Sequence, residues 1–212
     1  MSCSSTTPQQ STVRGSGQRC NLVGTGMGNN VALTACVPAG TVAEGATCTR
    51  TGGRLGADDC GVGLSCVNYG QASATERACH RLCRNSSDCM GGASCLAVSD
   101  APRAGICRPR CELLGSDCPM GTCRYLNAWT TMDESSAATM VTACLPMGDG
   151  VEGGMCSNSN DCGANLLCVR SSASAQGACR RVCDSTHACP AGTNCNGTMS
   201  ATNPTAAGAC VP

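Results

Sequence analysis

Cysteine makes up 23 of the 212 residues in this chain, and this constrains the fold more than any other feature. A cysteine share of roughly 8–10 percent already marks a disulfide scaffold. The chain has no Phe, and its Leu, Val and Ile number 12, 13 and 1. So little apolar bulk does not offset the conformational entropy lost on folding unless crosslinks help. The composition therefore excludes a conventional enzyme core and predicts a small, disulfide-rich fold.

The cysteines also predict the compartment. This many thiols persist as disulfides only in oxidising surroundings, so we expect an extracellular or cell-surface protein. A metal cluster is the competing explanation. Zinc sites favour C-x2-4-C knuckles in matched pairs. This chain has no C-x-x-C, and His80 and His187 are far apart. C-x3-C occurs three times, always as the joint between repeats: Cys79/Cys83, Cys107/Cys111 and Cys179/Cys183. We therefore expect disulfides, with no metal site and no cofactor.

The cysteines repeat in a four-cysteine module. The second cysteine follows the first by about six residues (twelve in module 2), the third follows after about six more, and the fourth follows a longer loop. We number the modules 1 to 6 from the N-terminus, and module 1 is incomplete. The cysteines of modules 1 to 6 are Cys20 and Cys36; Cys48, Cys60, Cys66 and Cys79; Cys83, Cys89, Cys95 and Cys107; Cys111, Cys118, Cys123 and Cys144; Cys156, Cys162, Cys168 and Cys179; and Cys183, Cys189, Cys195 and Cys210.

The gaps between modules repeat as well. They are eleven, three, three, eleven and three residues long, so the chain divides into two triplets of modules. We predict a flexible tether over 1–19, a first triplet over 20–110 and a second over 111–212. The tether is rich in Ser, Thr, Gln and Gly.

An odd number of cysteines leaves one without a partner in the chain. Cys3 is the odd one by position, which leaves 22 cysteines for eleven bridges. Module 1 has only third and fourth cysteines, which favours third–fourth and first–second pairing. An interleaved pattern, first–third and second–fourth, satisfies the complete modules equally.

Two other positions recur in the modules. A residue tolerant of positive φ stands three places after the second cysteine and predicts a left-handed turn. An aspartate stands just before the second cysteine, where it can accept backbone N–H bonds. One aspartate per module does not supply the six or more oxygens of a calcium site. The turn positions are Gly63, Gly92, Gly121, Asn165 and Gly192; the aspartates are Asp59, Asp88, Asp117 and Asp161, with Ala188 as the exception.

Short apolar segments around the third and fourth cysteines predict a small two-stranded hairpin in each module. An isolated hairpin is marginal in water, so the bridges must stabilise it. We expect an irregular β fold with little or no helix. Because each module can contact only its neighbours, we also expect an elongated tandem array of disulfide-stapled hairpins.

The string Cys83-RNSSDCMGGASCLAVSDAPRAGI-Cys107 resembles the N-terminal cysteine-rich domain of Dickkopf proteins. It is also similar to cysteine-rich repeats of secreted proteins and lipoproteins from myxobacteria. The resemblance covers 20–212 and rests mostly on Cys, Gly and Asp. In Dickkopf proteins the module belongs to secreted, receptor-binding ligands, and no binding residue carries over. The absence of Lys and near absence of Ile favour a GC-rich bacterial genome.

The N-terminal segment predicts an anchor. A cysteine followed by a polar tether is typical of a mature bacterial lipoprotein, so we expect Cys3 either to carry a lipid or to be an ordinary disulfide cysteine. No stretch reaches the ~18 apolar residues of a membrane span. The N-terminus has no signal-peptide pattern, so we expect a processed form or a fragment.

The three-residue joints between modules hold five arginines: Arg81, Arg108, Arg110, Arg180 and Arg181. If the modules stack in line, these form basic patches that bind acidic polysaccharide. The alternative is solvated edge residues that pair with nearby acids. A net charge of zero and only three aromatic residues argue against nucleic acid.

The longest loop, from Arg124 to Ala143, carries Tyr125 and Trp129. Aromatic residues on a loop of a rigid scaffold are usual anchors of a binding surface. The alternative is that they shield the backbone of their own module. No recognisable sequence pattern places a nucleophile and an acid with either histidine, so we expect no catalysis.

Together these features predict a non-catalytic, disulfide-stapled repeat protein outside the cell or at its surface. We expect a structural, adhesive or binding role, with a protein, an acidic polysaccharide or a second copy as partner. The alternative is a secreted inhibitor or toxin-like ligand that acts through one exposed loop. Six similar modules favour the first hypothesis, because an inhibitor needs one good loop.

Overall fold

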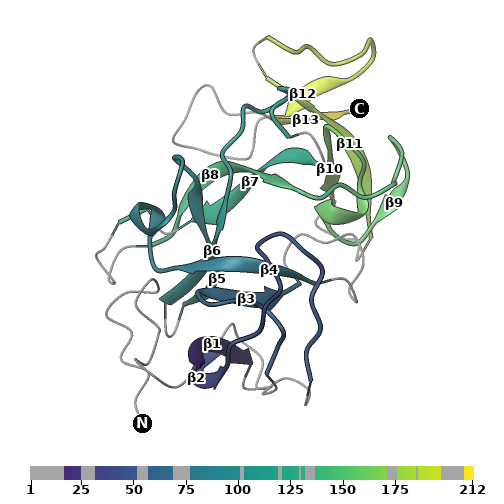
Figure 1. Ribbon diagram of the computed structural model, residues 1–212. Coiled ribbons are helices and arrows are strands. Elements are labelled where there is room, and N and C mark those ends of the chain that lie inside the picture. The colour runs from purple at the N-terminus through teal and green to yellow at the C-terminus, as the bar shows by residue number, and fades with distance from the viewer. Residues whose placement is uncertain are drawn as a thin grey trace. The chain divides into compact units, whose positions relative to one another are not determined.

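The chain is an assembly of short antiparallel strands in a computed structural model (Figure 1). Among the described residues the only helical elements are two 3₁₀ turns, η3 (Ser86–Asp88) and η4 (Ser159–Asp161). The prediction of a disulfide-rich, irregular β fold is therefore confirmed. The structure describes residues 17–24, 32–51, 57–68, 77–100, 103–118, 121–128, 130–131, 137–170, 176–184, 186–196 and 208–212.

Each module contributes one β-hairpin, as predicted. One strand carries the third cysteine and the other the fourth, and we name them the third-cysteine and fourth-cysteine strands. A further short strand, β9 (Met155–Cys156), pairs with β11. The hairpins of modules 1 to 6 are β1 (Gln18–Gly24) with β2 (Ala32–Pro38), β3 (Leu64–Val67) with β4 (Ala78–Cys83), β5 (Ser94–Asp100) with β6 (Arg103–Arg108), β7 (Thr122–Ala128) with β8 (Thr139–Leu145), β10 (Leu166–Val169) with β11 (Gly177–Cys183), and β12 (Asn194–Asn196) with β13 (Gly208–Val211).

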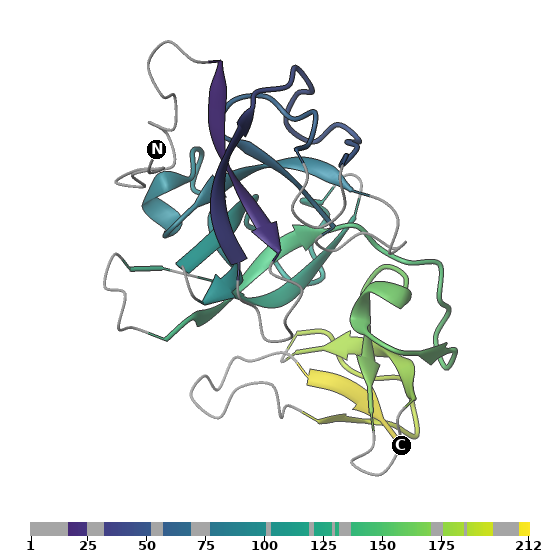
Figure 2. The same cartoon turned by 90° about the horizontal axis from the view of Figure 1, so that it is seen from below.

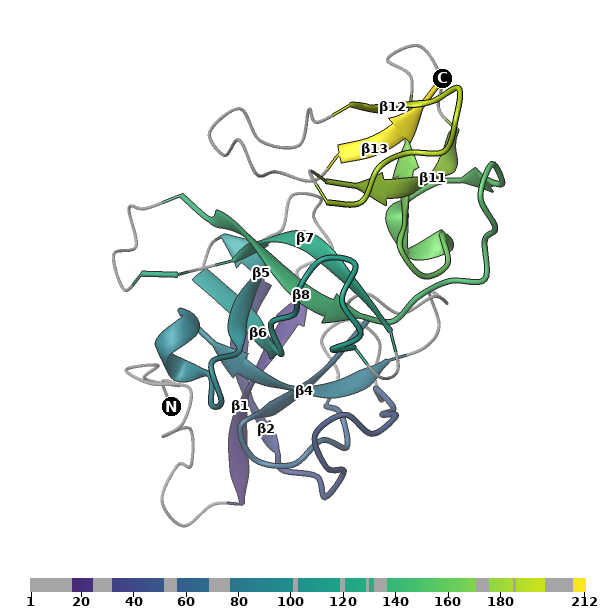
Figure 3. The same ribbon diagram turned by 90° about the horizontal axis from the view of Figure 1, so that it is seen from above.

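Two of the three-residue joints are continuous strands rather than loops. β4 pairs with β3 through residues 78–81 and with β6 through Leu82 and Cys83, so modules 2 and 3 share it. β11 is shared by modules 5 and 6 in the same way, and Figure 3 shows it beside β13. β6 ends at Arg108, because Pro109 has no N–H to continue a ladder.

Sharing of strands builds larger sheets from the hairpins. The six-stranded sheet has the order β3-β4-β6-β5-β7-β8, and the five-stranded sheet has the order β10-β11-β13-β12 with β9 attached to β11. The hairpin β1-β2 is a two-stranded sheet, which Figure 2 shows as a strongly twisted ribbon. A module is therefore not an isolated folding unit, because its fourth-cysteine strand can belong to two hairpins.

The five complete modules share one disulfide connectivity, first to third and second to fourth. Module 2 has Cys48–Cys66 and Cys60–Cys79. The third and fourth cysteines, such as Cys66 and Cys79, face each other across the ladder, yet each bonds to a cysteine of the preceding turn. Extending third–fourth pairing from module 1 to the complete modules is therefore wrong, because the incomplete module has no turn cysteines. The other bridges are Cys83–Cys95, Cys89–Cys107, Cys111–Cys123, Cys118–Cys144, Cys156–Cys168, Cys162–Cys179, Cys183–Cys195 and Cys189–Cys210.

Module 1 follows its own arrangement. Cys36 is disulfide-bonded, and the residue opposite it in the β1-β2 ladder is Cys20. With no first and second cysteines in this module, the ladder itself brings a cysteine to face Cys36. The inference that third and fourth cysteines pair stays a prediction for this module, whereas it is wrong in the other five.

The left-handed turn position is confirmed in four of the five modules. Gly63, Gly92, Asn165 and Gly192 have φ of 75°, 73°, 56° and 85°. Gly121 does not have a positive φ, so the prediction is wrong there. Its glycine has another cause, since a Cβ would lie 2.1 Å from the carbonyl oxygen of Leu145.

The two eleven-residue gaps form the same structure, which we call the collar (37–47 and 145–155). In each, a glycine N–H donates to the carbonyl of the second cysteine of the next module: Gly40 to Cys60 at 2.8 Å and Gly148 to Cys162 at 3.0 Å. A second glycine donates to the carbonyl of the fourth cysteine, at 2.8 Å in both collars. The repeated gap length therefore reflects a repeated docking of linker onto module.

The cores of the modules are built from cystine. In module 2, Cys48, Cys60, Cys66 and Cys79 are all at most 7% exposed and pack with Leu64. Modules 3 and 5 have similar clusters of buried cysteines. Sulfur thus supplies the buried apolar surface that the scarce aliphatic side chains do not.

The chain divides into two compact units. One comprises 1–69, 73–110 and 125–143, and the other comprises 70–72, 111–124 and 144–212. The predicted triplets and the elongated arrangement stay predictions. Within the described residues, no helix is long and apolar enough to span a membrane.

Candidate functional site

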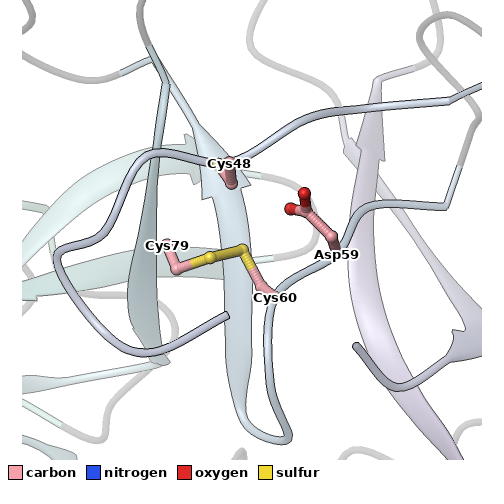
Figure 4. A group of neighbouring side chains, drawn as sticks. All are labelled: Cys48, Asp59, Cys60 and Cys79. Carbon is pink, nitrogen blue, oxygen red and sulfur yellow. A yellow bond between two sulfur atoms is a disulfide. The ribbon is translucent and has the colours of Figure 1, made fainter. Parts of the chain in front are cut away.

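The crossed disulfides bring three or more potential ligand atoms together in each complete module. In module 2 these are the sulfurs of Cys48, Cys60 and Cys79 and the carboxylate of Asp59, within 4.8 Å of one another (Figure 4). A metal ligand, however, is a thiolate, and each of these sulfurs is in a disulfide. The clusters are therefore cystine cores in the oxidised protein.

The aspartate before the second cysteine ties that cysteine to the first. Its carboxylate accepts from the N–H of the residue that follows the first cysteine, with distances of 3.0 Å from Thr49 to Asp59 and 2.8 Å from Arg84 to Asp88. Modules 4 and 5 repeat this contact through Asp117 and Asp161. The predicted acceptor role is confirmed, and the hydroxyl of Thr49 holds the pKa of Asp59 below its usual value.

Module 6 reverses this arrangement. Ala188 stands before its second cysteine, and Asp184, which follows the first cysteine, is the acceptor instead. It accepts from the N–H groups of Thr186 and His187 at 2.8 and 2.7 Å. The His187 Nδ1 lies 2.9 Å from its Oδ1, and the Thr186 hydroxyl 2.8 Å away. These contacts, led by the Thr186 hydroxyl, lower the pKa of Asp184 well below its usual range.

A buried polar cluster joins module 1 to module 2. The guanidinium of Arg19 on β1 is fully buried and pairs with the carboxylate of Asp58, whose side chain is also fully buried. The same carboxylate accepts from Asn21 Nδ2 at 2.8 Å and from the N–H groups of Cys60 at 3.0 Å and Cys66 at 3.2 Å. All four donors satisfy one carboxylate, as a buried charge requires.

A second buried arginine joins module 4 to module 5. Arg124 on β7 is 2% exposed and donates to the carbonyl oxygens of Leu166 at 3.3 Å and Cys162 at 2.9 Å. Arg19 donates to the carbonyl of Leu64, which holds the same place in module 2 as Leu166 does in module 5. Burial lowers the pKa of Arg124 to about 10, while Asp161 acts in the opposite direction. Modules 1 and 4 therefore each contact the module that follows them through a buried arginine.

The joint arginines are mostly engaged with neighbours. Arg81 lies 3.1 Å from Glu44, and Arg181 lies 2.9 Å from Glu152; both glutamates come from the collars. Arg110 donates through Nε to the Ser94 hydroxyl at 2.8 Å. The remaining two, Arg108 and Arg180, are half-buried strand residues. Arg81, Arg108 and Arg110 belong to one compact unit and Arg180 and Arg181 to the other.

The long loop of module 4 is shorter than predicted. Residues 122–128 and 139–145 are strands, so Arg124 is buried in β7 and Tyr125 is a half-buried strand residue. Trp129 and Cys3 lie outside the described residues. The predicted binding loop and anchor therefore stay predictions.

His80 lies inside the shared strand β4 and is 3% exposed. Burial, reinforced by Arg108, lowers its pKa to about 4, so the ring is neutral at pH 7. Its Nε2 has no hydrogen-bond partner among the described residues. The other histidine, His187, does contact an acid, Asp184, which the sequence analysis did not predict. Two features of the sequence could have indicated the contact: Asp184 stands three residues before His187, and Ala188 replaces the aspartate that precedes the second cysteine in the other modules.

A small pocket of about 190 Å³ lies in the second compact unit. Leu167 and Val169 of β10 and Val211 of β13 give it an apolar lining, and Asn196 of β12 adds a polar group. It could accommodate a side chain or a few water molecules. Comparison of the chain with protein-family models, curated proteins and solved structures finds no match.

Proposed function

We propose that this chain is a non-catalytic, disulfide-stapled repeat protein that acts outside the cell or at its surface as a structural, adhesive or binding element. The observation that carries the proposal is the crossed disulfide pair, repeated in five modules. Bridges of this number form and persist in oxidising compartments. A cystine core keeps its shape where chaperones and reductants are absent.

The arrangement of polar groups supports the same role. The buried charges, Arg19 with Asp58 and Arg124 with backbone carbonyls, join modules to one another. The aspartates before the second cysteines satisfy turn N–H groups. These groups stabilise the modules and the contacts of modules 1 and 4 with the modules that follow them, and modules of this kind display loops between strands, which suits adhesion or scaffolding.

The test is the redox state of the exported protein together with its resistance to proteolysis. Exported protein should resist alkylation before reduction, and it should survive trypsin many times longer oxidised than reduced, although Arg110, Arg170 and Arg181 are exposed. Thiols that alkylate freely in the native protein would overturn the proposal. A protein that inhibits a protease or occupies a receptor at stoichiometric concentration would support the toxin-like alternative.

A further inference from the structure

The third-cysteine strands differ sharply in exposure. In β5 and β7, the cysteine and its two neighbours are buried, and the equivalent residues of β3 and β10 are buried or half-buried. In β12 the three equivalent residues, Asn194, Cys195 and Asn196, are all exposed. β12 is therefore an uncovered strand at the edge of the five-stranded sheet.

The junction between modules 3 and 4 shows what covers such a strand. β5 pairs with β7 through Leu96 and Ala128, and both residues are fully buried. Asn196 holds the place in module 6 that Leu96 holds in module 3, since each follows a third cysteine and pairs with the residue before a fourth. Among the described residues, no strand pairs with β12 in the way that β7 pairs with β5.

The opposite end of the chain supplies such a strand. The hairpin β1-β2 is the equivalent of β7-β8, since each opens a triplet and docks an arginine onto the next module. β7 lies between β8 and β5, whereas β1 pairs only with β2 in the part of the chain that the structure describes. The edge of β1 that faces away from β2 therefore corresponds, as a strand edge, to the edge that β7 offers to β5. Ala128, the residue of β7 that pairs with β5, follows the third cysteine by five residues, and the equivalent position after Cys20 lies outside the described residues.

We propose that copies of this chain associate head to tail, with β12 of one copy pairing with β1 of the next as β5 pairs with β7 inside each copy. The interface continues a junction that the chain already uses. It joins two different surfaces, so it does not close on itself in a dimer and generates a linear filament unless its rotation closes a ring. The inference rests on the structural role proposed above and names its partner as a second copy.

The charge distribution favours the same direction. Residues 1–110 contain ten arginines and six acidic residues, a net charge of +4, whereas 111–212 contain four and eight, a net charge of −4. Head-to-tail contact brings opposite charges together, while contact between two C-terminal ends brings like charges together. Complementary charges speed encounter and select the orientation, and salt screens them.

The experiment follows the oxidised full-length protein by sedimentation velocity over a concentration series, at low and high salt. A benzophenone amino acid at position 196 then locates the contact. We expect a ladder of oligomers that weakens with salt and a crosslink, in the reduced tryptic digest, between position 196 and a peptide that starts after Arg19. A monomer at every concentration, or crosslinks that stay within one copy, would overturn the proposal.

A pair of variants separates the edge of β12 from general surface effects. Asn194→Arg with Asn196→Arg places two positive charges against the basic half of the next copy and should weaken association about tenfold or more. Val62→Arg with Met90→Arg adds the same charge at exposed turn residues of modules 2 and 3 and should leave association unchanged. Equal effects of the two pairs would contradict the pairing of β12.

Intact mass after alkylation without reduction counts the free thiols, and sedimentation velocity gives the oligomeric state, so the two measurements together distinguish the two proposals. A fully bridged, protease-resistant monomer would refute head-to-tail pairing and leave the proposed function standing. Free thiols throughout the native protein would refute the proposed function, and any association would then need another cause.

Discussion

Replacing Asp58 by asparagine tests whether the buried ion pair secures module 1 to module 2. The change keeps the side-chain shape and removes the charge that faces Arg19. An amide has one oxygen, so it cannot accept from all four donors that the carboxylate now satisfies. Removing one partner of a buried ion pair costs about 3–5 kcal/mol, because the other charge stays buried.

Module 5 contains the matched control. Asn160 holds the place there that Asp58 holds in module 2, two residues before the second cysteine, and Arg124 uses carbonyl oxygens alone. Asn160→Ala removes no charge and should change the free energy of unfolding by less than about 0.5 kcal/mol. The loss of unfolding free energy caused by Asp58→Asn should lie near about 3 kcal/mol if Arg19 can use carbonyl oxygens in the way that Arg124 does.

The assay is guanidinium unfolding with the bridges intact, followed by far-UV circular dichroism, together with hydrogen exchange at the Cys60 and Cys66 amides. Both amides donate to the Asp58 carboxylate, so they should lose protection before the rest of module 2 does. A loss below about 1 kcal/mol with unchanged exchange at both amides would refute the reasoning, since the charge would then contribute no more than a neutral hydrogen bond.

Three further predictions follow from single positions. The pKa of His80 is lowered from 6.5 to about 4, so the unfolded chain binds the proton more readily than the folded chain does. The free energy of unfolding should therefore decline by up to about 3 kcal/mol as the pH falls from above 6.5 to 4. In unfolding measured as a function of pH, His80→Gln should remove this decline, whereas His187→Gln should not. Gly92→Asn should cost less stability than Gly92→Val, because Asn165 already adopts the same turn; equal losses in denaturant midpoint would argue against it. Asp184→Ser should destabilise module 6 by about 1 kcal/mol, and adding Ala188→Asp should restore it, as monitored by exchange of the turn amides.

The sequence predicts the local features of each module well. The hairpins, the acceptor role of Asp59 and the turn at Gly63 each depend on residues close together in the chain, where turn chemistry is decisive. Gly121 is the exception, because its close approach to Leu145 comes from a neighbour 24 residues away and not from a turn.

The connections between modules are not predictable in the same way. Arg19 and Asp58 lie 39 residues apart, and no spacing rule joins them. Crossed and uncrossed bridges use the same cysteines at the same spacing, so only the fold of the turn against the hairpin decides between them. Edge residues are one of two interpretations of the joints. The joints in β4 and β11 lie in interior strands instead, because strand pairing with two modules outweighs the polar character of residues such as Arg81.

The crossed bridges also determine how the protein responds to a pulling force. In module 2, Cys48 is fused to Cys66 and Cys60 to Cys79, so three backbone segments run in parallel between the same two fused points. The shortest segment, from Cys60 to Cys66, becomes taut first and limits the stretch to roughly 20 Å at about 3.3–3.6 Å per residue. The same module reduced would extend to roughly 100 Å. Oxidation therefore makes each complete module a far less extensible link than the same residues in the reduced chain.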